Sequence, residues 1–265
     1  MRLKLKMKIY LMVIKMNIKE IAADSLRFPF TNWKKLLILL ILVSFTVFMG
    51  QFILIIIPIS IILNGYLIRI IESTLEGSDE FPAFSDLKKL IIDGIKFIIV
   101  STIYGIPLLV VSVIAWGFLT LDPNSMNYAS FIISLIVGFI VNIIFLMGLT
   151  NMVYEKTIFG AFQFKRIINL INNVGWKKYL IYLLFFTLMV EGVDLITLVL
   201  SSMVIFISPL DIALVWENPI SYSFLAYLIF NGIISTYILI FGSRFRGLIY
   251  PIKSLKSENE TNTEA

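Results

Sequence analysis

Long apolar runs separated by short polar stretches dominate this chain. Apolar residues continue with few interruptions over residues 36–71, 90–120, 128–153, 179–207 and 222–242. Runs of about 18 or more apolar residues are typical of membrane-spanning helices, because about 20 helical residues cross the hydrocarbon core of a bilayer. The pattern therefore predicts an all-α fold, a polytopic membrane helical bundle.

The first apolar run is too long for one crossing. As a single helix, residues 36–71 would extend about 54 Å, whereas the hydrocarbon core is about 30 Å thick. A turn at Gly50-Gln51 would divide the run into two legs, and the length leaves open whether both legs span fully. With hairpins at about 36–71, 90–153 and 179–242, we expect about six transmembrane segments in three hairpins.

Two segments outside these runs have the pattern of amphipathic interfacial helices. In the first, Ile18, Ile21 and Ala22 recur at helical spacing until Pro29, which cannot continue a helix hydrogen-bond ladder. In the second, residues 158–173, polar and apolar side chains alternate with a helical period. We expect each segment to lie at the membrane surface.

The remaining ends of the chain are polar. Residues 1–15 form a basic N-terminal extension whose apolar part is shorter than the core of a signal peptide. Either it lies on the membrane surface, or the functional start is Met16. Residues 16–250 are expected to form a single integral membrane domain, and residues 251–265 a polar, disordered tail.

The basic residues are distributed asymmetrically. In the three-hairpin arrangement, the connecting loops at 50–51, 121–127 and 208–221 contain no Lys or Arg. All 22 Lys and Arg residues then fall on the opposite side of the membrane, in residues 2–35, 69–96, 156–178 and 244–256. The positive-inside rule places that side, with both termini, in the cytoplasm. The chain is therefore predicted to be a multi-pass protein of the cell membrane.

A pair of lysines precedes the first apolar leg of each hairpin, twice after a tryptophan. The repetition favours three degenerate copies of one unit, although many membrane chains place basic residues at helix starts. Tryptophan and basic side chains prefer the membrane–water boundary. The predicted interfacial anchors are Trp33, Lys34, Lys35, Lys88, Lys89, Trp176, Lys177, Lys178, Arg244 and Arg246.

Composition excludes several chemistries. The chain contains neither Cys nor His, which excludes thiolate nucleophiles, imidazole bases and His/Cys metal sites. It also contains no P-loop or glycine-rich dinucleotide motif. We expect no enzymatic activity, no catalytic residue, no cofactor and no metal. Because its basic residues cluster at the ends of apolar runs, we expect no nucleic-acid partner.

Glu191 and Asp194 are the strongest candidates for a functional site. They lie one helical turn apart within an apolar run, where an unpaired charge costs about 2.5–3.5 kcal/mol on insertion scales. Together with Asn142 and Asn231, they are candidates for a polar path through the membrane. The alternatives are that the helix breaks at residues 191–194 and exposes the pair at the outer surface, and that the asparagines are interhelical hydrogen-bond partners.

A cluster of acidic side chains follows the first hairpin. Glu72, Glu76, Asp79 and Glu80 can bind a cation or a basic partner, or they can balance the neighbouring basic residues. The second role is favoured. Asp86 has the position of an N-cap for a helix that begins at Leu87.

The stretch GYLIRIIESTLEGSDEFPAFSDLKKLIIDGIK resembles a family of prokaryotic multi-pass membrane proteins catalogued as domain of unknown function 4013. The segments SLRFPFTNWKKLLI and EKTIFGAFQFKRIINLINNVGWKKYLIYLLF are similar to other parts of that family, and the resemblance covers roughly residues 16–250. It implies a membrane location and a helical fold, and supplies no activity. The loop motif that carries it comprises Gly65, Tyr66, Arg69, Gly77, Asp79, Glu80, Pro82 and Phe84, followed by Asp93 and Gly94.

Two functions remain. The favoured one is a non-enzymatic integral membrane protein that organises the membrane or acts as a scaffold. Its partners would be membrane lipids, with other membrane proteins or a second copy of the chain as further candidates. The alternative is a small transporter or channel that uses Glu191, Asp194, Asn142 and Asn231.

Overall fold

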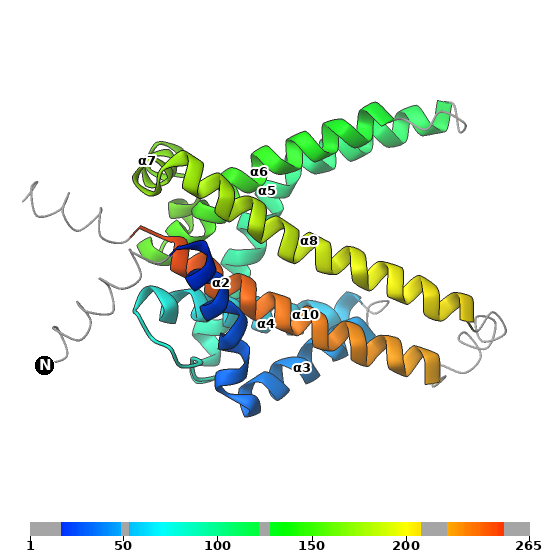
Figure 1. The fold of residues 1–265 in the computed structure, drawn as a ribbon, viewed down its shortest axis with the longest axis horizontal. Coiled ribbons are helices and arrows are strands. Elements are labelled where there is room, and N and C mark those ends of the chain that lie inside the picture. The colour runs from blue at the N-terminus through cyan, green and yellow to red at the C-terminus, as the bar shows by residue number, and fades with distance from the viewer. Residues whose placement is uncertain (1–16, 49–52, 122–127, 208–221, 252–265) are drawn as a thin grey trace, which may run out of the picture. The chain divides into compact units, whose positions relative to one another are not determined.

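The structure, a computed structural model, describes residues 17–48, 53–121, 128–207 and 222–251 (Figure 1). Within these ranges the chain forms helices and turns and no strand, which confirms the predicted all-α fold. The elements in chain order are α2 (Ile18–Arg27), η1 (Phe28–Thr31), α3 (Trp33–Phe48), α4 (Ile53–Leu75), α5 (Leu87–Leu121), α6 (Tyr128–Glu155), η2 (Ile158–Phe162), α7 (Phe164–Val174), α8 (Trp176–Ile207) and α10 (Tyr222–Ile249).

Local sequence signals delimit α2. The side chain of Asn17 accepts hydrogen bonds from backbone N–H groups of the first turn, and the Glu20 carboxylate accepts one from the backbone N–H of Asn17. This reciprocal capping box satisfies donors that a helix start otherwise leaves unpaired. α2 ends at Arg27, before Pro29 in η1, as the sequence predicts. Its apolar face, which includes buried Ile21, packs against α10.

The first apolar run is divided into α3 and α4, as predicted. α3 ends at Phe48 and α4 begins at Ile53, so the predicted turn at Gly50-Gln51 lies outside the described residues. α3 has 16 residues and is about 24 Å long, which is shorter than the hydrocarbon core of about 30 Å. It reaches the length of a span only together with α2 and η1, from which it is bent by 88°.

Among the described residues, four helices are long and apolar enough to cross a membrane, or five if the bent pair forms one span. The four stretches are Ile56–Leu75, Leu87–Ile114, Ile132–Glu155 and Asn231–Ile249. α8 adds a helix of 32 residues at the place of the fifth predicted segment. The architecture is therefore compatible with the expected number of about six spans.

The predicted amphipathic helix over residues 158–173 is two elements, not one. η2 ends at Phe162, and α7 begins at Phe164. Gln163 between them has φ −78° and ψ 66°, which lies outside the α region. The apolar periodicity of α7 is nevertheless as expected, since Ile167 and Ile171 are buried.

The predicted alternative of a helix break at residues 191–194 is wrong. α8 continues from Trp176 to Ile207 without interruption. Gly192 is the only weak helix former that could have broken it, and an interior glycine costs only about 1 kcal/mol relative to alanine. The long apolar flanks on both sides outweigh that cost.

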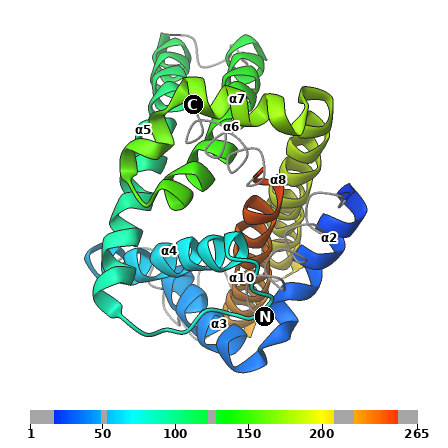
Figure 2. The same ribbon diagram turned by 90° about the vertical axis from the view of Figure 1, so that its left-hand side faces the viewer.

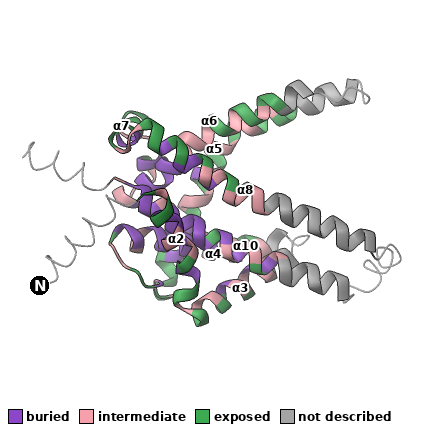
Figure 3. Ribbon diagram, viewed as in Figure 1, coloured by how far each residue is buried: buried purple, intermediate pink, exposed green. Residues whose placement is uncertain are grey.

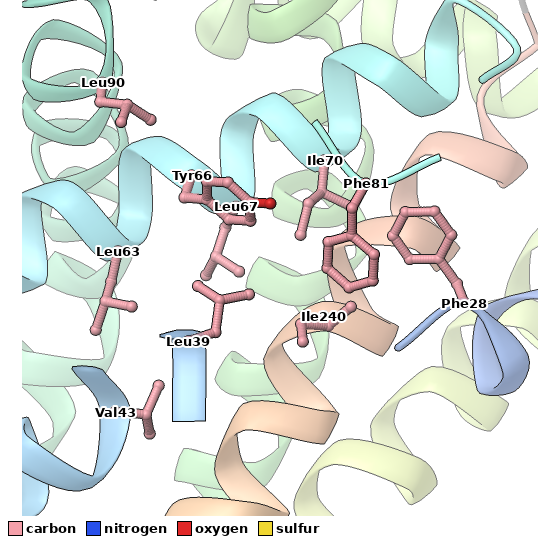
Figure 4. Packing of buried hydrophobic residues seen from close by; sticks show 10 residues of the cluster. All are labelled: Phe28, Leu39, Val43, Leu63, Tyr66, Leu67, Ile70, Phe81, Leu90 and Ile240. Carbon is pink, nitrogen blue, oxygen red and sulfur yellow. The ribbon is translucent and has the colours of Figure 1, made fainter. Parts of the chain in front are cut away.

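The described residues form two compact units, each considered by itself: Met1–Gly94 with Leu184–Ile249, and Ile95–Leu183 with Tyr250–Ala265. In the first unit, α10 packs against α2, α3 and α4, and Figures 2 and 3 show α4 beside α10 where buried residues gather. In the second unit, α6 packs against η2 and α7. The core of the first unit (Figure 4) consists of Phe28, Leu39, Val43, Leu63, Tyr66, Leu67, Ile70, Phe81, Leu90 and Ile240.

Two glycines allow the first turns of α5 to cross α4 closely. A Cβ atom on Gly65 would lie 1.9 Å from the carbonyl oxygen of Leu90, and one on Gly94 would lie 1.9 Å from the carbonyl oxygen of Ile61. No side chain fits at either distance, so only glycine permits this backbone approach. The crossing fixes where the loop between α4 and α5 begins and ends.

We predict that Gly65→Ala forces α4 and α5 apart. The substitution should lower the free energy of unfolding by roughly 1–3 kcal/mol, the usual cost of overpacking. The matched control is Gly105→Ala in α5, because no atom lies within 4 Å of its Cβ position. Thermal unfolding of the detergent-purified full chain measures both, and equal melting temperatures would contradict the close crossing.

Candidate functional site

The loop between α4 and α5 (residues 76–86, the α4–α5 loop) begins with a turn at Gly77. The φ angle of Gly77 is +75°, a left-handed conformation that glycine adopts without steric cost. The backbone N–H of Gly77 donates to the carbonyl oxygen of Thr74, and that of Ser78 donates to Ser73, both at 2.9 Å. These bonds satisfy carbonyl groups at the C-terminal end of α4.

Asp86 ends the α4–α5 loop and caps α5. Its Oδ1 accepts a hydrogen bond from the backbone N–H of Lys89 at 3.1 Å, which confirms the predicted N-cap. The side chain of Lys89 forms an ion pair with Glu72 of α4 at 2.7 Å. The first turn of α5 is thus fastened by its cap and by a charge pair, and Glu72 has the charge-balancing role that the sequence favours.

Arg69 of α4 holds the second half of the loop through its backbone. Nη1 donates to the carbonyl oxygens of Ala83, at 2.9 Å, and Ser85, and Nη2 donates to that of Asp86 at 2.8 Å. Arg69 is buried, and hydrogen bonds from a charged donor are stronger than those between neutral groups. One side chain therefore fixes three carbonyl groups of the loop backbone relative to α4.

Tyr66 and Lys35 hold the middle of the loop in the same way. The hydroxyl of Tyr66 donates to the carbonyl oxygen of Pro82 at 2.9 Å, and its ring stacks on Phe84 with centroids 4.0 Å apart. Lys35 of α3 donates through Nζ to the carbonyl oxygen of Phe81 at 2.7 Å. Side chains from α3 and α4 thus bind adjacent carbonyl groups.

Arg244 of α10 binds the start of the loop and joins it to α2. Its Nε donates to Oδ1 of Asp24 at 2.7 Å, and Nη2 donates to Oδ2 of Asp24 at 3.3 Å and to Oδ1 of Asp79 at 2.6 Å. Nη1 donates to the carbonyl oxygen of Ser78 and, at 3.5 Å, to Oγ1 of Thr74. All five N–H donors of this guanidinium therefore have an acceptor.

Aromatic rings complete the contacts around Arg244. Its guanidinium lies 4.6 Å from the ring centroid of Phe28, a cation–π distance. Phe28 in turn stacks on Phe81 of the loop with centroids 4.7 Å apart (Figure 4). The loop consequently has an apolar contact with η1 in addition to its polar contacts with α10.

The two carboxylates that pair with Arg244 differ in environment. The side chain of Arg244 is 3% exposed, that of Asp24 is 32% exposed, and that of Asp79 is 77% exposed. An exposed pair contributes little because water and salt screen it, whereas the bidentate pair with the partly buried carboxylate offsets the desolvation of the guanidinium. Asp24 is therefore the principal counter-ion.

This arrangement holds the loop in position. Arg244 and Arg69 donate to acceptors of the protein itself, so these hydrogen bonds fix the loop and are not directed at a bound substrate. Among the described residues, no group of three or more acidic side chains could hold a metal ion. The α4–α5 loop is best understood as a rigid end of the first unit.

The structure corrects the prediction that Arg244 and Arg246 are headgroup anchors. Arg244 is buried and ion-paired with α2 and the loop, while Arg246 is largely buried with its guanidinium 4.9 Å from the ring centroid of Phe186. A basic residue inside the end of an apolar span requires a counter-ion. Asp24, an acidic residue in the first amphipathic helix, is the sequence signal that could have identified the counter-ion of Arg244.

The other predicted anchors divide into two groups. Lys35 and Lys89 make the intramolecular contacts described above. The rest have exposed side chains at the starts of α3, α5 and α8, and these are Trp33, Lys34, Lys88, Trp176, Lys177 and Lys178. Their exposure is compatible with an anchoring role, which stays a prediction.

The described residues do not test the candidate polar path. Asn142 lies half-buried in α6 of the second unit, and Asn231 lies half-buried in α10 of the first unit. Glu191 and Asp194 belong to the uninterrupted α8, and their side chains lie outside the described part of the structure. The path therefore stays a prediction.

A second polar cluster, which the sequence did not single out, lies in the second unit. Nδ2 of the fully buried Asn151 donates to the carbonyl oxygen of Gly160 at 2.8 Å and to Oε1 of Gln163 at 3.3 Å. The hydroxyl of Tyr250 donates to Oδ1 of Asn151 at 2.5 Å, and burial raises the pKa of this hydroxyl. The cluster fastens η2 to α6.

The part of the chain that contains the α4–α5 loop matches a known protein family. The family model described as "Protein of unknown function (DUF4013)" matches residues 48–207. The chain belongs to this family. No curated protein and no solved structure matches it. The matched residues include the α4–α5 loop, η2 and α7, whereas α2 and Arg244 lie outside them.

The motif that carries the predicted family resemblance has a structural explanation. Gly65 allows the close crossing of α4 and α5, and Gly77 makes the turn that starts the loop. Tyr66 and Arg69 bind the loop backbone, and Asp79 pairs with Arg244. We conclude that this motif specifies how the loop folds onto the helices.

We predict that Asp24→Asn destabilises the chain more than Asp79→Asn. The first change should cost about 2–4 kcal/mol, because it removes the bidentate partner of a buried guanidinium and leaves only one carboxylate. The second should cost below about 1 kcal/mol, as for other exposed pairs. Thermal unfolding of the full chain, with the exposed Glu76→Gln as control, would contradict this ranking if Asp79→Asn had the larger effect.

Proposed function

We propose that this DUF4013 protein is a non-enzymatic integral membrane protein that organises lipids or other membrane proteins around it. The supporting observation is the distribution of its polar and apolar groups. Arg69, Arg244 and Asp79 at the α4–α5 loop are bound to the protein itself. The outward-facing side chains of the long helices are apolar.

The apolar surface of α5 carries most of this proposal. Only 6% of the best span-length stretch within Leu87–Ile114 is buried inside the protein, and Ile103, Ile106 and Leu109 are among its exposed side chains. Apolar surface contributes about 25 cal/mol for each Å² removed from water. Such a helix is stable only among lipid chains or against another membrane protein, which are the partners that we propose.

The proposed topology has both termini in the cytoplasm of a cell-membrane protein. In support, the described basic residues lie near one end of each long helix: the start of α3, α5 and α8, and the end of α4, α6 and α10. In antiparallel hairpins these ends share one side of the membrane. Basic residues of this kind are retained on the cytoplasmic side.

We expect cysteine substitutions at Asn124 and Asn218 to react with a membrane-impermeant maleimide added to intact cells. A cysteine at the exposed Glu80 should react only after permeabilisation. The chain contains no native cysteine, so each signal comes from one position. The opposite labelling pattern would overturn the topology.

A small transporter or channel remains the second candidate. The observation that favours it is the continuity of α8 through Glu191 and Asp194, which lie at positions i and i+3 of one helix face. In such a helix the two carboxylates enter the membrane region unless they reach its far edge. Intramembrane carboxylates commonly mark proton or cation pathways.

Flux measurements distinguish the two functions. The full chain reconstituted in liposomes should leave proton and potassium leak at the level of protein-free vesicles if it is a scaffold. The control is the variant with both Glu191→Gln and Asp194→Asn, checked for equal reconstitution. A flux that the wild-type chain supports and the double variant loses would contradict the scaffold and establish the transporter.

A further inference from the structure

Exposed apolar side chains occur on both η2 and α7, and no described part of the second unit covers them. Phe159 of η2 is exposed, and so are Phe164 and Ile168 of α7, with exposed fractions of 53% and 41%. Large apolar side chains gathered on one surface mark an interaction site more often than scattered ones do. Trp176, at the start of α8, is also exposed, and its Nε1 donates to Oδ1 of Asn172 of α7 at 2.5 Å.

Successive residues of a helix are rotated by about 100°, which divides α7 into three sectors. Ile167, Leu170 and Ile171 are buried and face the protein. Phe164 and Ile168, one turn apart, form a second sector beside the first. The third, opposite the protein, is polar and exposed, and it contains Lys165, Asn169, Asn172 and Asn173.

This order of sectors is the one expected for a helix at the boundary between water and hydrocarbon. A helix that packed on protein with all other sides in water would need only one apolar sector. In α7 a second apolar sector continues from the buried face, and polar side chains begin immediately after it. The second sector therefore has the side chains expected of a helix face that contacts the hydrocarbon layer.

The segment that contains η2, α7 and the start of α8 is basic. Residues 155–178 contain five basic side chains and one acidic side chain. The acid, Glu155, forms an ion pair with Arg166, so it does not neutralise the lysines around it. Lys165 of α7 and Lys177 and Lys178 at the start of α8 are exposed, and Nζ of Lys178 lies 5.5 Å from the ring centroid of Tyr182. Indole and ammonium groups at such positions prefer the headgroup layer.

We propose that η2, α7 and the start of α8 form a binding site for anionic phospholipids. Phe159, Phe164 and Ile168 enter the outer part of the hydrocarbon layer, and Lys165, Lys177 and Lys178 bind lipid phosphate groups. This inference rests on the proposed membrane location and specifies the lipid class. Juxtamembrane basic residues attract anionic lipids in this way.

Spin labelling tests the placement of α7. In the cysteine-free chain, single cysteines at positions 164, 168, 169 and 173 carry a nitroxide in phosphatidylcholine–phosphatidylglycerol liposomes. Labels replacing Phe164 and Ile168 should be more accessible to oxygen, which partitions into lipid. Labels replacing Asn169 and Asn173 should be more accessible to a water-soluble nickel complex. Equal nickel accessibility at all four positions, or occlusion of the first two from both reagents, would overturn the inference.

Lipid selectivity tests the basic side chains. Spin-labelled phosphatidylglycerol should associate with the wild-type chain in preference to spin-labelled phosphatidylcholine. The triple variant Lys165→Gln, Lys177→Gln and Lys178→Gln should lose most of that preference. The control replaces Lys19 and Arg27 with glutamine, at exposed positions of the first unit that are not among the predicted anchors. An equal loss in this control, or no loss in the first variant, would contradict a localised site.

A label at Ile106 of α5 separates this inference from the proposed function. If that label is accessible to the water-soluble nickel complex instead of oxygen, α5 faces water, and the membrane-organising function fails. If it is accessible to oxygen while the labels on α7 are not, only the lipid site fails. The two outcomes are therefore distinguishable in one set of samples.

Discussion

A guanidinium group removed from water requires an acceptor for each of its donors, and this requirement organises the first unit. Arg244 meets it with side chains and backbone from α2, α4 and the α4–α5 loop. Arg69 donates to three carbonyl groups of the loop. An unsatisfied buried charge would cost several kcal/mol. Four elements distant in sequence are therefore held in one arrangement, and the polar loop folds against the helix ends.

The close crossing of α4 and α5 makes those contacts geometrically attainable. Gly65 and Gly94 bring the backbones of α4 and α5 together. The two ends of the loop are therefore close to α4, and carbonyl groups of the loop lie within hydrogen-bond distance of its side chains. Tyr66 and Lys35 then reach adjacent carbonyls. Backbone contact and hydrogen bonding support each other, which explains why glycine and long polar side chains occur together in this part of the chain.

The charged side chains described above bind within the protein, and the exposed faces of its long helices are apolar. This arrangement is expected of a protein that is surrounded by a lipid bilayer. The long faces of α5 and α6 present isoleucine, leucine and valine, while the described ion pairs join parts of the same unit. α7 adds an intermediate environment with protein, apolar and polar sectors side by side. The proposed role in organising membranes rests on this surface chemistry, since the polar contacts at the loop hold parts of the same unit together.

Periodicity and charge placement in the sequence determined the helical class, the positions of the apolar helices, the cap at Asp86 and the family, since each depends on contiguous residues. Tertiary structure decided the rest. Gln163 divides a segment that periodicity treats as one helix, because a single backbone torsion is not encoded in an apolar pattern. The continuity of α8 reflects long apolar flanks that outweigh one glycine. Above all, the pairing of Arg244 with Asp24 joins residues at opposite ends of the chain. Only the packed fold buries Arg244, and for that reason a residue that the sequence presents as a surface anchor is an internal ion-pair partner.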